Sequence, residues 1–142
     1  MKNELTEALY KSIERRANTH YGKTGVLLSG GGDSRPLAVH SIPKPVAFTS
    51  YFDENNELRI ASEVARRLGL EHVLIKRSPD SMLEGLTNSP YYTGGMSTGG
   101  SATFLELLNN SAAQQVDNLI TDDYADWLLK DIAFNTEPRK IL

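Results

Sequence analysis

The sequence of 142 residues contains no cysteine. Disulfide frameworks, cysteine-ligated metal sites and thiol nucleophiles are therefore excluded, and a reducing compartment such as the cytoplasm is expected. No stretch approaches the roughly 18 consecutive apolar residues of a membrane span. Residues 1–20 are polar and hold no apolar core of a secretion signal. We therefore expect a cytoplasmic protein without a membrane partner.

An excess of basic charge is also missing, since 15 lysines and arginines face 18 aspartates and glutamates, a net charge of −3. Without a long basic run, a nucleic-acid partner is not expected. The pairs Arg15-Arg16 and Arg66-Arg67 fall in helical patterns and indicate solvated helix faces. The length and ordinary composition predict one globular domain over residues 1–142, with a core at 24–134 and a tail at 135–142.

Helical and strand patterns alternate along the chain. Apolar residues at spacings of three and four predict an N-terminal helix over 2–18. Further helices are expected over 34–40, 57–68, 81–86, 104–109 and 126–134, and short apolar strands over 25–28, 46–50, 72–75 and 118–121. Residues 87–102, rich in Gly, Ser and Thr, are expected to be irregular. Because each strand is apolar throughout, the pattern predicts a doubly wound parallel α/β sheet with helices on both faces.

The stretch SGGGDS at 29–34 lies between an apolar strand and a helix. Glycines let successive N–H groups point into one concavity, and a helix N-terminus adds partial positive charge. Ser29 and Ser34 add hydroxyls, so phosphate or pyrophosphate is the expected ligand, with a plain tight turn as the alternative. No lysine lies in 29–35, which excludes the Walker loop. Arg35 stands where the dinucleotide fingerprint needs its third glycine.

The segment GVLLSGGGDSRPLA resembles the pyrophosphate loop, SGGxDS, of the N-type ATP pyrophosphatases, the PP-loop superfamily. Two further segments, AFTSYFDENNELRIASEVARRLGLEH and NLITDDYADWLLKD, are similar to the asparagine synthetase family. The resemblance runs from about residue 24 to 131 and corresponds to the synthetase domain without the glutaminase half. A sheet ordered 3-2-1-4 would bring SGGGDS and TDDYAD to one crevice, at the point where the strand order reverses.

The resemblance implies ATP and Mg²⁺ as cofactors, with cleavage of ATP to AMP and pyrophosphate. It also implies adenylation of a small, aspartate-like carboxylate that then reacts with an amine donor. The implied catalytic residues are Asp33, Ser34 and Arg35, and the implied magnesium ligands are Asp33, Asp123 and Asp126. The nucleotide-binding residues expected on this basis are Leu28, Ser29, Gly30, Gly31, Gly32, Asp33, Ser34, Phe48, Thr49, Ser50, Thr121 and Asp122.

The last acidic segment departs from the family pattern. Asp122 and Tyr124 stand where the family has glycines, and Trp127 stands where it has glutamate. Two alternatives therefore remain open: a nucleotide-binding module without transfer chemistry, and an RNA-modifying PP-loop enzyme. The acids from 122 to 126 could also form a solvated turn. Asp33 could cap the following helix.

Several smaller features carry weaker expectations. Glu57 aligns with a family acid, or it favours the N-terminus of its helix. GMSTG at 95–99 fits the nucleophile-elbow pattern, but no strand leads into it. We expect a glycine loop there, with residues 97–100 folding over the ligand. The histidines are expected to be structural. The helix over 2–18 would pack on its own sheet or on a second copy in a homodimer.

Overall fold

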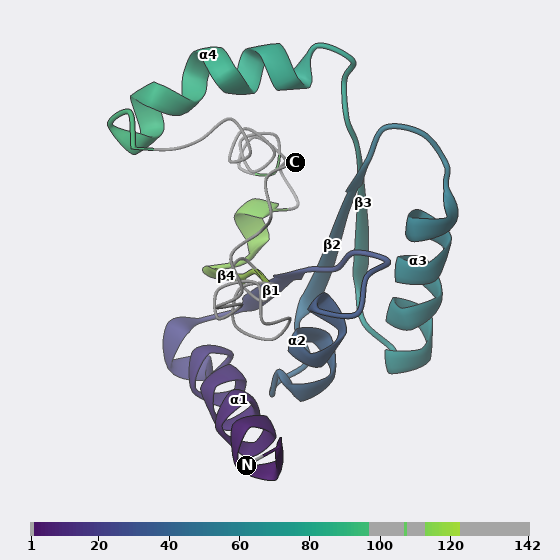
Figure 1. Ribbon diagram of the computed structural model, residues 1–142, viewed down its shortest axis with the longest axis vertical. Helices are drawn as coiled ribbons and strands as arrows, with labels where there is room; N and C mark the ends of the chain where they lie inside the picture. The colour runs from purple at the N-terminus through teal and green to yellow at the C-terminus, as the bar shows by residue number, and fades with distance from the viewer. Residues whose placement is uncertain (1, 97–106, 108–112, 123–142) are drawn as a thin grey trace, which may run out of the picture.

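The computed structural model describes residues 2–96, 107 and 113–122. Its centre is a parallel four-stranded sheet in the order β3-β2-β1-β4 (Figure 1). The predicted parallel sheet and its strand order are thereby confirmed. The strands are β1 Thr24–Leu27, β2 Val46–Tyr51, β3 His72–Lys76 and β4 Asn118–Ile120.

The register of the sheet places two distant segments side by side. Val26 of β1 lies opposite Ala47 of β2 and opposite Ile120 of β4. Parallel strands end at the same edge of a sheet. The loop that follows β1 and the residues Thr121 and Asp122 that follow β4 therefore leave the sheet at neighbouring positions.

Helices follow the strands as the pattern predicts. The α3 helix begins after Asn55, whose side chain accepts a hydrogen bond from the Leu58 N–H at 2.9 Å, and it ends at Gly69 with φ of 63°. The α1 helix is two residues shorter than expected. The helical elements are α1 Lys2–Arg16, η1 Thr19–Tyr21, α2 Ser34–His40, α3 Asn56–Leu68, α4 Ser81–Thr93 and η3 Ala113–Gln115.

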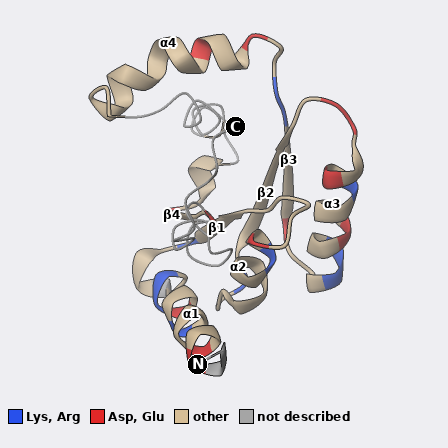
Figure 2. Ribbon diagram, in the orientation of Figure 1, with Lys and Arg blue, Asp and Glu red and all other residues tan. Residues whose placement is uncertain are grey.

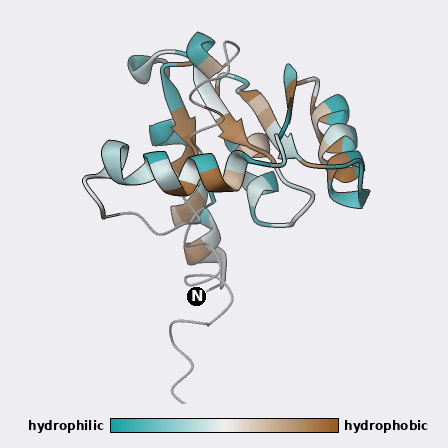
Figure 3. Ribbon diagram, turned by 90° about the horizontal axis from the view of Figure 1, so that it is seen from above, coloured by the Kyte–Doolittle hydropathy of each residue, from teal (hydrophilic) through white to brown (hydrophobic). Residues whose placement is uncertain are grey.

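The apolar core lies on both faces of the sheet. Figure 3 shows the hydrophobic colour concentrated on the strands. On one face, buried side chains of α1, α2 and α3 and of Ala17, the residue after α1, pack against β1, β2 and β4; the helical ones are Ile13, Leu37, Ala38, Ala61 and Ala65. On the other face, Phe48 and Ile75 pack against Leu107, Ala113 and Val116. The N-terminal helix thus packs on its own fold, as one of the two alternatives expected.

The prediction that residues 87–102 are irregular is wrong for its first part, because α4 continues to Thr93 and includes Pro90. Hydroxyl groups that often compete with helical hydrogen bonds here bond within the helix. The Thr87 hydroxyl donates to the Leu83 carbonyl and the Thr93 hydroxyl to the Ser89 carbonyl, each at 2.8 Å. Gly94, with φ of 62°, then ends the helix.

Other expectations fall on residues beyond the described part. Leu107 is helical and buried, but the rest of the helix expected over 104–109 lies outside the described residues. So do residues 97–102, the helix expected over 126–134 and the tail. None of the described helices combines the length and apolarity needed to cross a membrane.

Candidate functional site

The chain is fixed to β2 immediately before the glycine loop. The Leu28 N–H donates to the Phe48 carbonyl at 2.8 Å, and the Thr49 hydroxyl donates to the Leu28 carbonyl at 2.6 Å. Leu28, Phe48 and Thr49 are buried, whereas Ser50 is exposed. Of the predicted nucleotide-binding residues on β2, only Ser50 therefore presents its side chain to solvent.

A histidine on β3 supports this anchor. The His72 Nε2 atom lies 2.8 Å from the Thr49 hydroxyl oxygen. Because the single hydroxyl proton of Thr49 points to the Leu28 carbonyl, the His72 Nε2–H is the donor in this pair. Burial lowers the pKa of His72 from its ordinary value. A neutral His72 therefore ends a chain of hydrogen bonds that reaches the start of the loop.

The two serines of SGGGDS hold the loop against the first turn of α2. The Ser34 side chain is fully buried, and its hydroxyl accepts the Ser29 N–H at 3.1 Å and lies 3.0 Å from the Ser29 hydroxyl. The Gly31 N–H donates to the Ser29 hydroxyl at 3.2 Å. These hydrogen bonds of the Ser34 hydroxyl thus lie within the loop. Its predicted contact with phosphate stays a prediction.

The glycines of the loop have different surroundings. A Cβ added at Gly30 would lie 2.5 Å from the Glu57 Cα, so the loop touches the backbone of α3. A Cβ at Gly32 would meet nothing within 4 Å, and the φ of Gly32 is not positive. The protein itself thus requires glycine at Gly30 and not at Gly32. Close approach of a ligand to the backbone would explain glycine at the second position.

Two charged residues flank the turn into α2. The Arg35 Nη2 donates to the Gly30 carbonyl at 3.0 Å, and its side chain is otherwise exposed. Asp33 directly precedes α2, yet its side chain makes no capping hydrogen bond. The alternative that Asp33 caps the helix through its side chain is therefore wrong. Asp33 is half-buried and is the fifth residue of SGGGDS.

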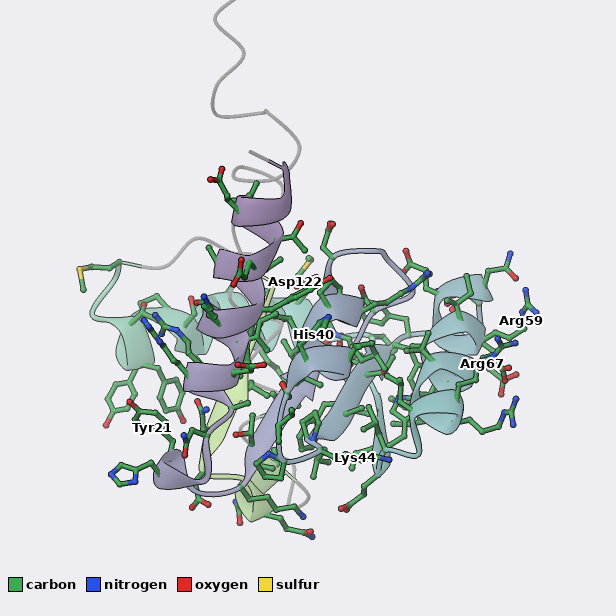
Figure 4. All side chains as sticks on the ribbon, turned by 90° about the horizontal axis from the view of Figure 1, so that it is seen from below. Tyr21, His40, Lys44, Arg59, Arg67 and Asp122 are labelled. Carbon is green, nitrogen blue, oxygen red and sulfur yellow. The ribbon has the colours of Figure 1, made fainter. Side chains whose placement is uncertain are left out.

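The acids that follow β4 are only partly within the described chain. Thr121 and Asp122 are half-buried, and Figure 4 shows Asp122 near the middle of the molecule. Asp123 and Asp126 lie outside the described residues. Within the described part, no three histidine or acidic side chains are grouped as metal ligands would be. The predicted magnesium set of Asp33, Asp123 and Asp126 stays a prediction.

Two contacts near the loop were not anticipated from the sequence. Helical periodicity gives Glu57 no reason to touch Gly30, because that contact depends on how α3 docks. The link between Thr49 and His72 depends on the pairing of β2 with β3, in which His72 lies opposite Ala47, two residues before Thr49. Alternation along two paired strands is the signal that could have indicated this second contact.

Comparison with known proteins identifies the family and the fold. The sequence model of the asparagine synthase family matches residues 4–138, nearly the whole chain. The solved structure of the NH3-dependent NAD synthetase of Campylobacter jejuni, in complex with the nitrate ion, is similar with a TM-score of 0.56 and 19% sequence identity. The alignment covers 90% of this chain and 59% of that one, so this chain spans less than two thirds of the length of the NAD synthetase. No curated protein matches the chain.

Proposed function

The chain belongs to the asparagine synthase family, and from this premise we propose that its SGGGDS loop holds the phosphates of ATP. Members of this family are ATP-using enzymes of the PP-loop superfamily. The observation that carries the proposal is the position of the loop, which joins β1 to α2 beside β4. From β1 the chain adds β2 and β3 on one side of the sheet and β4 on the other, so the strand order reverses between β1 and β4. Ligands of open α/β sheets bind at such a switch point, beyond the carboxyl ends of the strands.

We assign the phosphate contacts to backbone amides. The N–H groups of Gly30 and Gly32 are the proposed donors to the pyrophosphate part of ATP, since the bare Cα of Gly32 leaves room for a ligand. Arg35 is already fixed to the Gly30 carbonyl at 3.0 Å. Its remaining N–H groups are therefore the proposed donors to a phosphate oxygen.

The carboxylates of the site are assigned to magnesium. Mg²⁺, when bound, supplies neutralising charge for the phosphates of ATP. Asp33 is the ligand that we assign within the described residues, because it lies in the SGGGDS loop directly before α2. Asp123 and Asp126 complete the proposed set. Without such a cation, three acids close to a polyphosphate would repel it.

The proposed reaction transfers an adenylyl group. A carboxylate oxygen of an aspartate-like acceptor attacks the α-phosphorus of ATP, and the bond from that phosphorus to the bridging oxygen breaks. Pyrophosphate leaves with the bonding electrons, and an amine then displaces AMP from the acyl-adenylate. The chain need supply only positioning and charge stabilisation for the first step. Here the loop amides and Arg35 would stabilise the charge on the departing pyrophosphate.

Binding of ATP tests the position of the ligand. Calorimetry with ATP and Mg²⁺ should show binding by the wild-type chain and a loss of affinity of about tenfold or more in Gly32→Ala, because a methyl group would occupy the space of the phosphates. Arg59→Ala, on the exposed face of α3, is the control and should bind like wild type. Equal affinity of wild type and Gly32→Ala would refute the assigned cradle.

One sequence observation favours a second candidate, a nucleotide-binding module without transfer chemistry. Asp122 replaces a glycine of the family pattern beside the proposed magnesium ligands. Such a module would bind ATP and leave it intact. Analysis of the nucleotide after incubation with Mg²⁺, an acceptor and an amine separates the two candidates.

A further inference from the structure

We propose a second ligand site, at the amino end of β4, for a nucleoside monophosphate. The structure contains a pocket of about 590 Å³ there, lined mainly by the last two turns of α1 together with Tyr21 and Asn118. This site goes beyond the proposed ATP site, since Asn118 begins β4 whereas Thr121 and Asp122 follow its other end. The pocket volume lies in the usual range for small-molecule sites, about 300–1,000 Å³.

The walls of the pocket are held in place by contacts between distant segments. The Asn118 Nδ2 donates to the Arg16 carbonyl at 2.7 Å and so ties the end of α1 to β4. Ala17, the residue after α1, is fully buried in the core. The end of α1 is therefore fixed relative to the sheet before any ligand binds, which lowers the entropic cost of binding.

The pocket has a cationic lining. Three of its residues, Lys11, Arg15 and Arg16, are basic, and none is acidic. Figure 2 shows basic positions in blue on α1, with acidic positions in red. Lys11 pairs with Glu7 at 2.9 Å, but both side chains are more than 60% exposed and the pair is weak. The last turn of a helix carries about half a negative charge, which the three cations exceed.

The two arginines differ from a similar pair elsewhere on the surface. On α3, Arg66 and Arg67 both bond to Glu63, at 2.8 and 2.7 Å. Among the residues that the structure describes, neither Arg15 nor Arg16 forms an ion pair. Their guanidinium groups are therefore available for an anion, and their planar forks match the oxygens of a phosphate.

Tyr21 indicates which second group the ligand carries beside its phosphate. Its side chain is 60% exposed and lines the same pocket. A flat base stacks well on an aromatic ring, and Asn118 and Ser12 add hydrogen-bonding groups to the walls. A phosphate monoester that carries a planar ring system, such as a nucleoside monophosphate, fits this combination.

An NMR titration of the full chain with AMP tests the proposal. Backbone signals of Arg16, Tyr21 and Asn118 should shift, and the double variant Arg15→Ala/Arg16→Ala should bind AMP about tenfold more weakly or worse. Inorganic phosphate should lose affinity in the double variant and not in Tyr21→Ala. Adenosine should lose affinity in Tyr21→Ala and not in the double variant. AMP should bind Tyr21→Ala more weakly than wild type.

Controls separate this site from the proposed ATP site and from unfolding. Arg59→Ala lies on the opposite side of the molecule from Tyr21 (Figure 4) and should bind AMP like wild type. Gly32→Ala should keep the shifts at Tyr21 and Asn118 even if ATP binding fails. The proposal is overturned if AMP shifts only signals of residues 29–35, or if the folded double variant binds AMP as tightly as wild type. It is also overturned if a single-stranded oligonucleotide, and not AMP, produces the shifts.

Discussion

The two edges of the sheet offer anions different chemistry. At the carboxyl edge, the proposed donors are backbone amides of SGGGDS, in a loop fixed by its own serines and by Gly30 against α3. At the amino edge, the pocket beside α1 presents the exposed side chains of Arg15 and Arg16. One edge has fixed donors of low charge, and the other has full charges on long side chains.

The two kinds of donor suit different tasks, namely stabilising charge at a fixed point and attracting an anion from solution. Fixed amides suit a reaction in which charge must be stabilised at one point, because they need no reorganisation when it develops. Exposed arginines suit reversible binding, and their attraction weakens with salt. Arginine alone does not create such a site, since Arg66 and Arg67 hydrogen-bond Glu63 and lower its pKa to about 2.

The largest effect should come from removing charge at the carboxyl edge. Asp33→Asn and Asp126→Asn should each abolish ATP turnover while the circular dichroism spectrum stays native, because each removes a proposed magnesium ligand. The loss should be about 100-fold or more, as for other groups that stabilise transition-state charge. Asp53→Asn, an exposed residue after β2, is the matched control. Full turnover in both test variants would show that the metal assignment is wrong.

A smaller effect should distinguish the two glycines within the loop. Gly30→Ala should lower the free energy of unfolding by about 1–3 kcal/mol, because its Cβ would lie 2.5 Å from the Glu57 Cα and one of the two segments must move. Gly32→Ala should change it by less than about 0.5 kcal/mol. Urea denaturation measures both. If the two variants were equally stable, the loop would not depend on its contact with α3.

The smallest effect concerns pH and the anchor before the loop. The pKa of His72 is lowered in the folded protein by burial, so the unfolded chain binds this proton more readily. The stability that a neutral His72 contributes is complete above its unfolded pKa near 6.5 and is lost as pH falls through the lower folded value. Stability from pH 7 to 5 should therefore fall less in His72→Gln than in wild type. Urea denaturation at pH 7 and at pH 5 measures the fall in the free energy of unfolding for each protein. An equal fall in the two proteins would contradict this prediction.

The sequence predicts local features of the fold well. Gly69 ends α3 as expected because a left-handed terminal residue is a local requirement. The strand order was expected from the resemblance to the PP-loop superfamily, and the structure has that order. The extent of α4 was not predicted, since Thr87, Ser89 and Pro90 each have a low helix propensity, and propensity is a weak guide that the rest of the fold can override.

The candidate site was predictable in part. SGGGDS identifies the loop, but nothing in the six letters shows that Ser34 points inward or that Gly30 touches α3. These features depend on docking between segments far apart in the chain. The pocket beside α1 was hidden for the same reason, because Arg15 and Arg16 look like any solvated helix face until Asn118 is placed next to them.

The most direct test of the account is phosphorus NMR of the products formed from ATP. The chain would be incubated with ATP, Mg²⁺, aspartate and ammonia, with Asp33→Asn in parallel. If the glycine loop holds the pyrophosphate of ATP, the wild-type chain should form AMP and pyrophosphate, and the variant should form neither. ADP and inorganic phosphate as the products, or ATP left intact by a chain that also fails to bind it, would contradict the claim that the glycine loop holds the pyrophosphate of ATP.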